Sequence, residues 1–131
     1  MRTCLAFAII VTAACGRETV TPIAACIDTI TPSLVEGTSA RFTWTPPCGL
    51  NQIMVTQAPS AGGTCPSTNS GVSWNLKAGT RLLVPAVDYG VAPAGSENVV
   101  PACPIEAGKT YRVDFLAPGN PQPVGVLAWS P

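Results

Sequence analysis

The stretch from Cys103 to Leu116, CPIEAGKTYRVDFL, decides the fold. It contains a turn signal, Ala-Gly-Lys, and then a run in which apolar and polar side chains alternate. The apolar positions of this run are Tyr111, Val113 and Phe115. A two-residue period of this kind is typical of a strand with one buried face. Ile105, six residues before the tyrosine, is expected to pack under the chain just before the strand. The stretch therefore predicts the central strand of an antiparallel β-sandwich.

Composition agrees with an all-β fold and excludes several functions. The chain has 131 residues, of which 47% are apolar and 11% are charged, and it holds 14 prolines and 12 glycines. That many turn residues favour short strands over long helices. The formal net charge is zero, so there is no basic surface for nucleic acid. Histidine is absent, which removes the usual general base and the commonest metal ligand. We expect no cofactor and no metal.

The remaining strands are expected where other short runs lie between turn signals. They cover Ile27–Val35, Ala40–Thr45, Asn51–Gln57, Val72–Lys77, one or two pieces of Arg81–Val91, and Val124–Trp129. Pro32 favours an edge position for the first of these strands because proline cannot donate to a neighbouring strand. In the fourth strand, Val72, Trp74 and Leu76 are expected to point inward. Residues 58–71 and 92–103 are rich in turn formers and predict loops, giving about seven strands in all.

The N-terminus has the features of a bacterial leader. A basic residue, Arg2, precedes an uncharged run, Leu5–Ala14, which is too short to span a bilayer but suits a signal peptide. The following Val11–Gly16, VTAACG, resembles the lipobox of bacterial lipoproteins. The resemblance implies a leader over residues 1–14, lipidation of Cys15 and a tether over residues 15–25. The alternative is ordinary secretory cleavage nearby, with Cys15 incidental.

Cysteine parity favours the lipoprotein over ordinary secretion. Cleavage before Cys15 would leave five cysteines, which cannot all pair in an oxidising compartment. One lipidated cysteine leaves four, and its acyl chains would suffice for a stable anchor. The expected location is therefore the bacterial cell envelope, with the chain facing the periplasm or the exterior. Gly16 follows the cysteine where retained lipoproteins have aspartate, and by resemblance to Gram-negative lipoproteins this implies the outer membrane.

Two segments resemble fibronectin type III modules, which are immunoglobulin-like sandwiches. Phe42–Pro47, FTWTPP, resembles their second strand, and Ile105–Tyr111, IEAGKTY, resembles their tyrosine corner. The resemblance implies one sandwich domain over residues 26–131, in which the tyrosine hydroxyl bonds to nearby backbone. The residues that it assigns to the structural core are Trp44, Ile105, Tyr111, Val113 and Phe115. A small jelly roll or another antiparallel sandwich is the alternative.

Strand order in such a sandwich leads to a disulfide pairing. If strands alternate up and down, Cys26 and Cys48 lie at one end, and Cys65 and Cys103 lie at the other. We therefore predict the disulfides Cys26–Cys48 and Cys65–Cys103, one of three possible connectivities. A zinc site is the rival use of four cysteines, but no C-x2-C spacing exists and the expected compartment is oxidising.

No group of residues predicts catalysis, so we expect no enzyme. Lys77 and Lys109 adjoin predicted turns and are expected to be solvated. The acidic residues are scattered, whereas a glycosidase needs two converging carboxylates. Arg112 and Asp114 share the outer face of the central strand and are expected to form a solvated pair.

Three aromatic residues are the weak candidates for ligand binding: Trp74, Tyr89 and Trp129. A core role is the favoured interpretation of each, and an exposed ring would instead suggest stacking on a sugar or docking of a partner. The two long loops are expected at the same end of the sandwich, which would be the first place to look for recognition. The expected function is that of a non-catalytic, membrane-anchored interaction or structural module with a protein partner. A carbohydrate-binding module of the cell envelope is the alternative, and a small secreted inhibitor or enzyme accessory subunit is a more distant one.

Overall fold

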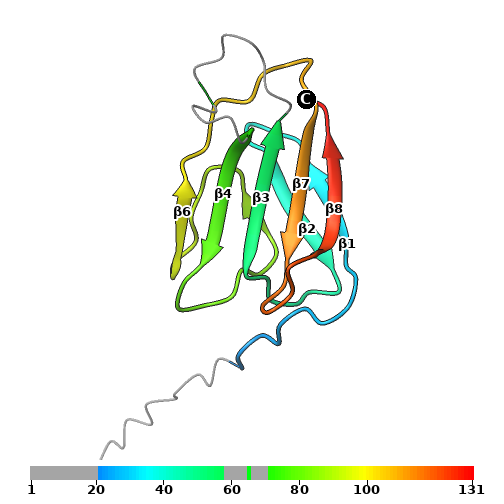
Figure 1. Ribbon diagram of the computed structural model, residues 1–131, viewed down its shortest axis with the longest axis vertical. Helices are drawn as coiled ribbons and strands as arrows, with labels where there is room; N and C mark the ends of the chain where they lie inside the picture. Colours follow the sequence, from blue (N-terminus) through cyan, green and yellow to red (C-terminus); the bar gives the residue numbers. More distant parts are fainter. Residues whose placement is uncertain (1–20, 58–64, 66–70) are drawn as a thin grey trace, which may run out of the picture.

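The computed structural model describes residues 21–57, 65 and 71–131, and Cys15 lies outside them. Within these ranges the chain forms eight strands and no helix, arranged as two antiparallel sheets (Figure 1). The strands are β1 (Thr31–Val35), β2 (Arg41–Thr45), β3 (Gln52–Gln57), β4 (Val72–Ala78), β5 (Val87–Asp88), β6 (Ser96–Val100), β7 (Tyr111–Leu116) and β8 (Pro123–Trp129). The expected all-β, two-sheet fold is confirmed.

The larger sheet has the strand order β6-β4-β3-β7-β8. Strand β7 comes from the stretch that decides the fold, and it pairs with β3 on one side and β8 on the other. Its alternating side chains Tyr111, Val113 and Phe115 are fully buried, as their period predicts. Strand β3 lies in the middle of the sheet and β7 next to it.

The smaller sheet has the order β1-β2-β5 and covers the inner face of the larger one (Figure 1). Phe42 and Trp44 of β2 are buried and pack on the other sheet, with Phe42 and Phe115 meeting edge to face at 6.2 Å. Strand β1 is an edge strand that contains Pro32, as expected, although it begins at Thr31 and not at Ile27. Aromatic side chains from both sheets therefore fill the core.

Two strands differ from their sequence predictions. A bulge in β4 places Trp74 opposite Val55 and Val72 opposite Thr56, so Ser73 is an extra residue. The extra residue changes the expected faces only at the start of the strand: Ser73 is fully buried and Val72 only partly so, whereas Trp74 and Leu76 are buried as expected. The apolar run 81–91 forms only the two-residue β5 and an isolated bridge between Leu50 and Leu83.

Strand β6 was not expected, because it lies inside the segment predicted as a loop, 92–103. It pairs only with β4 and is an exposed edge, so its side chains carry no buried alternation. The strand also separates the two ends of that segment. Gly95 accepts hydrogen bonds from Gly79 and Thr80, just after the last residue of β4, whereas the Cys103 N–H donates to the carbonyl oxygen of Ser73, near the first residue of β4. The segment therefore does not lie at one end of the sandwich. The other predicted loop, 58–71, lies outside the described residues except for Cys65 and Gly71.

Both predicted disulfides are confirmed. Cys26 and Cys48 are joined with their Cα atoms 4.9 Å apart, and Cys65 and Cys103 with theirs 5.7 Å apart. The first bond lies where the described chain enters the sandwich and joins the segment before β1 to the segment after β2. The second joins the segment after β3 to the segment before β7, at the opposite end of the sandwich. Each end of the sandwich therefore carries one covalent crosslink.

Candidate functional site

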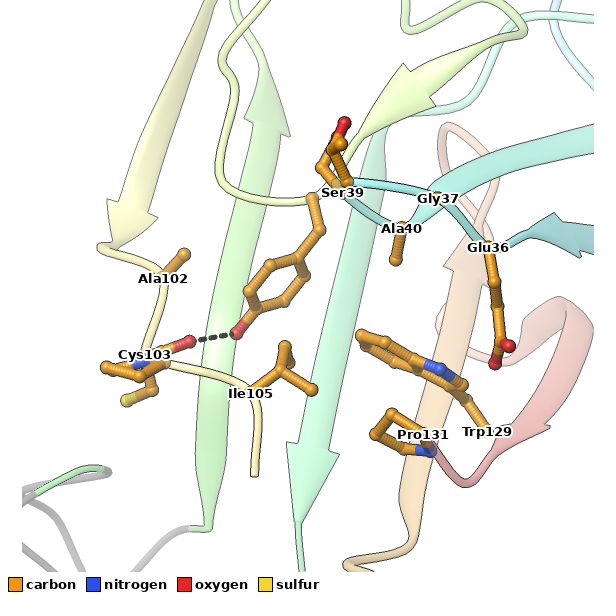
Figure 2. A pocket seen from close by; sticks show the side chains of 12 residues that line it. Glu36, Gly37, Ser39, Ala40, Ala102, Cys103, Ile105, Trp129 and Pro131 are labelled. Atoms are coloured by element: carbon orange, nitrogen blue, oxygen red, sulfur yellow. Dashed lines mark hydrogen bonds between the residues drawn. The ribbon is translucent and has the colours of Figure 1, made fainter. Parts of the chain in front are cut away.

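A pocket of about 570 Å³ opens at the upper end of the sandwich, between the two sheets. Four segments that are far apart in the sequence line it: the β1–β2 turn (36–40), Tyr89 after β5, residues 102–105 before β7, and the end of the chain after β8 (Figure 2). Most of the wall is apolar. The volume falls in the range of ligand pockets, which usually combine apolar walls with a few polar groups.

Tyr89 forms one wall and joins the two sheets. Its hydroxyl donates to the carbonyl oxygen of Cys103 at 2.9 Å, and the carbonyl oxygen of Ser73 lies 3.3 Å away. Its ring packs against Trp74 at 5.1 Å and against Trp129 at 5.8 Å, both nearly edge to face. Burial raises the pKa of Tyr89 well above its usual value, so the hydroxyl stays protonated at neutral pH. Tyr89 is therefore a neutral donor and not a general base.

Trp129 is buried beside Tyr89 and has an unused hydrogen-bond donor. Only 4% of the residue is exposed, and among the described residues its Nε1–H has no partner. The other two tryptophans are satisfied: Trp44 Nε1–H donates to the Cys48 carbonyl at 2.9 Å, and Trp74 Nε1–H donates to Asn98 Oδ1 at 2.8 Å. An unpaired buried donor costs about 1–3 kcal/mol, so this N–H favours any acceptor that reaches it.

Among the described residues, Glu36 supplies the only carboxylate side chain of the pocket wall, and no lysine or arginine lines it. It lies in the exposed turn between β1 and β2. Figure 2 shows its side chain extending beside Trp129, on the side of the indole that carries the nitrogen. The described part of the pocket thus offers a largely apolar wall, one unused N–H donor and one carboxylate side chain.

Most residues assigned to the core lie there. Trp44, Tyr111, Val113 and Phe115 are buried, and Ile105 is half-buried, packing against the core and lining the pocket. The Tyr111 hydroxyl accepts a hydrogen bond of 2.9 Å from the backbone N–H of Glu106. This is the short backbone contact that the resemblance to a tyrosine corner implied.

The three aromatic candidates for ligand binding come together in one cluster. Tyr89 contacts both Trp74 and Trp129, but Trp74 is fully buried and presents no ring face to solvent. Sequence reasoning did not identify Glu36 or the role of Ile105 in the pocket wall. No local pattern could have done so, because the pocket forms only where the β1–β2 turn meets the end of β8.

The surface charges form pairs rather than a catalytic group. Arg112 Nε lies 2.8 Å from Asp114 Oδ1 on the outer face of the larger sheet, and Asp114 is more buried than the expected solvated pair would be. Arg41 and Asp88 face each other across β2 and β5 with contacts of 2.7 and 3.1 Å. The hydrogen bond from Arg41 lowers the pKa of Asp88. Of the lysines near predicted turns, Lys77 is exposed and Lys109 is partly buried.

Two further properties hold for the described ranges. Residues 21–57, 65 and 71–131 contain no group of three or more acidic or cysteine side chains placed to hold a metal ion. The same ranges contain no helix with the length and apolar character needed to cross a membrane.

Comparison of the chain with protein-family models, with curated proteins and with solved structures finds no match.

Proposed function

We propose that the chain is a non-catalytic lipoprotein of the bacterial envelope, anchored through Cys15, whose immunoglobulin-like sandwich acts as an interaction or structural module. The observation that carries the proposal is the use of the cysteines. The chain has six, and four of them form the two disulfides of the sandwich. The two that remain, Cys4 and Cys15, both precede the sandwich, and Cys15 follows the small residues of the lipobox-like segment. Disulfides also suit an envelope compartment.

Strand arrangement supports the resemblance to immunoglobulin-like and fibronectin type III modules. Strands β1, β2 and β5 share one sheet, as strands A, B and E do in such modules, and β3, β7 and β8 are neighbours, as C, F and G are. Strand β4 extends the larger sheet beside β3, as strand C′ does in the variable type. Strand β6 departs from the pattern, because it comes after β5 in the chain and pairs with the outer edge of β4.

Anchoring at Cys15 would direct the pocket away from the membrane. The chain enters the sandwich at the end opposite the pocket, where Ala25 bridges Gly49 and Cys26 is bonded to Cys48 (Figure 1). The ten residues from Gly16 to Ala25 reach roughly 33 Å at full extension, so the domain would stay close to the bilayer. The pocket end would then face possible partners in the envelope space.

The burial of the tryptophan rings favours a protein partner over a glycan. Stacking on a sugar needs an exposed aromatic face, whereas Trp44, Trp74 and Trp129 are each at most 4% exposed. Tyr89 is partly exposed, but its hydroxyl is held by the backbone of Cys103. An interaction module with a peptide or protein ligand is therefore the function that we favour.

Lipid labelling tests the proposal. The full chain would be expressed in a bacterial host supplied with an alkyne-bearing fatty acid, and the membrane fraction would be probed for label. Cys15→Ser should abolish both the label and membrane retention, and Cys4→Ser is the matched control that should keep both. Label that persists in Cys15→Ser, or an unlabelled native chain, would refute the anchor.

A further inference from the structure

The pocket at the upper end combines three features that packing of the core alone does not require. Trp129 in the pocket wall has a buried Nε1–H without a partner among the described residues, Glu36 adds a carboxylate on the same side of the pocket (Figure 2), and the rest of the wall is largely apolar. The indole nitrogen is covered in this conformation, and the neighbouring Glu36 belongs to an exposed turn. Access of a ligand to the nitrogen therefore requires a side chain of the pocket wall to move.

Each feature selects a chemical group on a ligand. An N–H donor pairs with a carbonyl or another acceptor, a carboxylate with an ammonium group, and an apolar wall with an apolar side chain. Because no lysine or arginine among the described residues lines the pocket, an anionic ligand would find no cationic side chain there and would be repelled by Glu36. The ligand must therefore carry a cation, an acceptor close to it and an apolar body.

We propose that this pocket binds the free N-terminal residue of a partner polypeptide, with the α-ammonium group on Glu36, the first carbonyl on Trp129 Nε1–H and an apolar side chain against Tyr89 and Ile105. The first residue of a peptide joins these three groups through a single Cα atom. An internal peptide segment has the carbonyl and the side chain but lacks the ammonium group, and a C-terminus has the wrong charge. The inference deepens the proposed interaction function by naming the ligand of its site.

The indole N–H signals of the three tryptophans allow ligand binding at Trp129 to be measured directly by NMR. The full chain, labelled with ¹⁵N and held in a mild detergent, should show three indole N–H signals, and loss of one in Trp129→Phe assigns the signal of interest. Phenylalaninamide is the probe, because it has an ammonium group, a carbonyl and an aromatic side chain. Addition of this probe should shift the Trp129 signal along a saturable curve and leave the Trp44 and Trp74 signals in place.

Two comparison compounds test the charge. N-acetylphenylalaninamide keeps the carbonyl and the ring but is neutral, and we expect it to bind about fivefold more weakly, since charge-assisted hydrogen bonds are about twice as strong as neutral ones. N-acetylphenylalanine is anionic and should give no saturable shift. These compounds also control for partition into the detergent, because all three carry the same ring.

Two substitutions test the residues. Glu36→Gln should weaken the binding of phenylalaninamide about fivefold and leave that of the acetylated amide unchanged. Glu97→Gln is the matched control, because Glu97 is an exposed glutamate on β6 that does not line the pocket. The affinity of Glu97→Gln for phenylalaninamide should equal that of the native chain.

Three results would overturn the inference: no saturable shift of the Trp129 signal, equal affinity for the acetylated amide, or unchanged affinity in Glu36→Gln. None of them would affect the labelling of Cys15. A failed pocket and a failed anchor are therefore distinguished by separate measurements.

Discussion

The Tyr89 hydroxyl donates a hydrogen bond of 2.9 Å to the carbonyl oxygen of Cys103. Tyr89 follows β5 in the smaller sheet, and Cys103 precedes β7 in the larger sheet and carries a disulfide. This bond therefore ties the two sheets together at the pocket, at the point where the Cys65–Cys103 crosslink also acts.

Tyr89→Phe should reduce the free energy of unfolding by about 1–2 kcal/mol, because it removes the donor and leaves a partly buried carbonyl unpaired while keeping the ring. Urea denaturation followed by tryptophan fluorescence would measure the change. A variant as stable as the native chain would show that water replaces the hydroxyl without loss.

Replacing each tryptophan by phenylalanine should give unequal losses. Trp44→Phe and Trp74→Phe each break a hydrogen bond, to Cys48 and to Asn98, whereas Trp129→Phe removes a donor that has no partner. We expect Trp129→Phe to cost about 1 kcal/mol less than either of the others. The three midpoints of urea denaturation provide the measurement, and the largest loss at Trp129 would contradict this ranking.

Much of this core could be predicted from the sequence, because burial imposes a period on it. The alternation in 111–116 predicted which side chains of β7 face the core, and the expected strand order predicted which cysteines pair. The bulge at Ser73 and the edge strand β6 could not be predicted in the same way. A bulge interrupts the period at one residue, and an exposed edge strand buries no face that would create one.

The candidate site was harder to predict than the fold. The aromatic residues Tyr89 and Trp129 were identified by type, but which of them was buried depended on contacts between the two sheets. Glu36 could not be identified from the sequence, because a glutamate in a turn is ordinary and only the fold brings it to the same pocket as Trp129. Long-range contact, and not local pattern, forms this site.

The two disulfides should contribute similar but unequal stability. The bonds separate residues by 22 and 38 positions, and loop-closure entropy then gives about 3.4 kcal/mol for Cys26–Cys48 and about 3.9 kcal/mol for Cys65–Cys103. Paired Cys→Ser variants, Cys26→Ser with Cys48→Ser and Cys65→Ser with Cys103→Ser, would be compared by urea denaturation. A loss below about 1 kcal/mol for either pair would contradict a stabilising role for that bond.

The Arg41–Asp88 pair should make a small, pH-dependent contribution. The hydrogen bond from Arg41 lowers the pKa of Asp88 below its ordinary value of 3.8 in the folded state. Stability from this pair is therefore present above the unfolded pKa and is lost as the pH falls through the lower folded pKa. The stability difference between the native chain and Asp88→Asn should be largest near neutral pH and shrink in the acid range.

Thermal unfolding of both proteins from neutral to strongly acidic pH would test this expectation. Glu97→Gln serves as the control, because no salt bridge involves Glu97 in the described residues. A difference for Asp88→Asn that grows as the pH falls would contradict the sign.

The Cys26–Cys48 disulfide has a mechanical consequence for a tethered domain. Tension on the chain before Cys26 would otherwise peel β1, an edge strand, away from β2 one hydrogen bond at a time. The covalent bond passes part of that load to Cys48, between β2 and β3, so that the pull is shared by strands of both sheets.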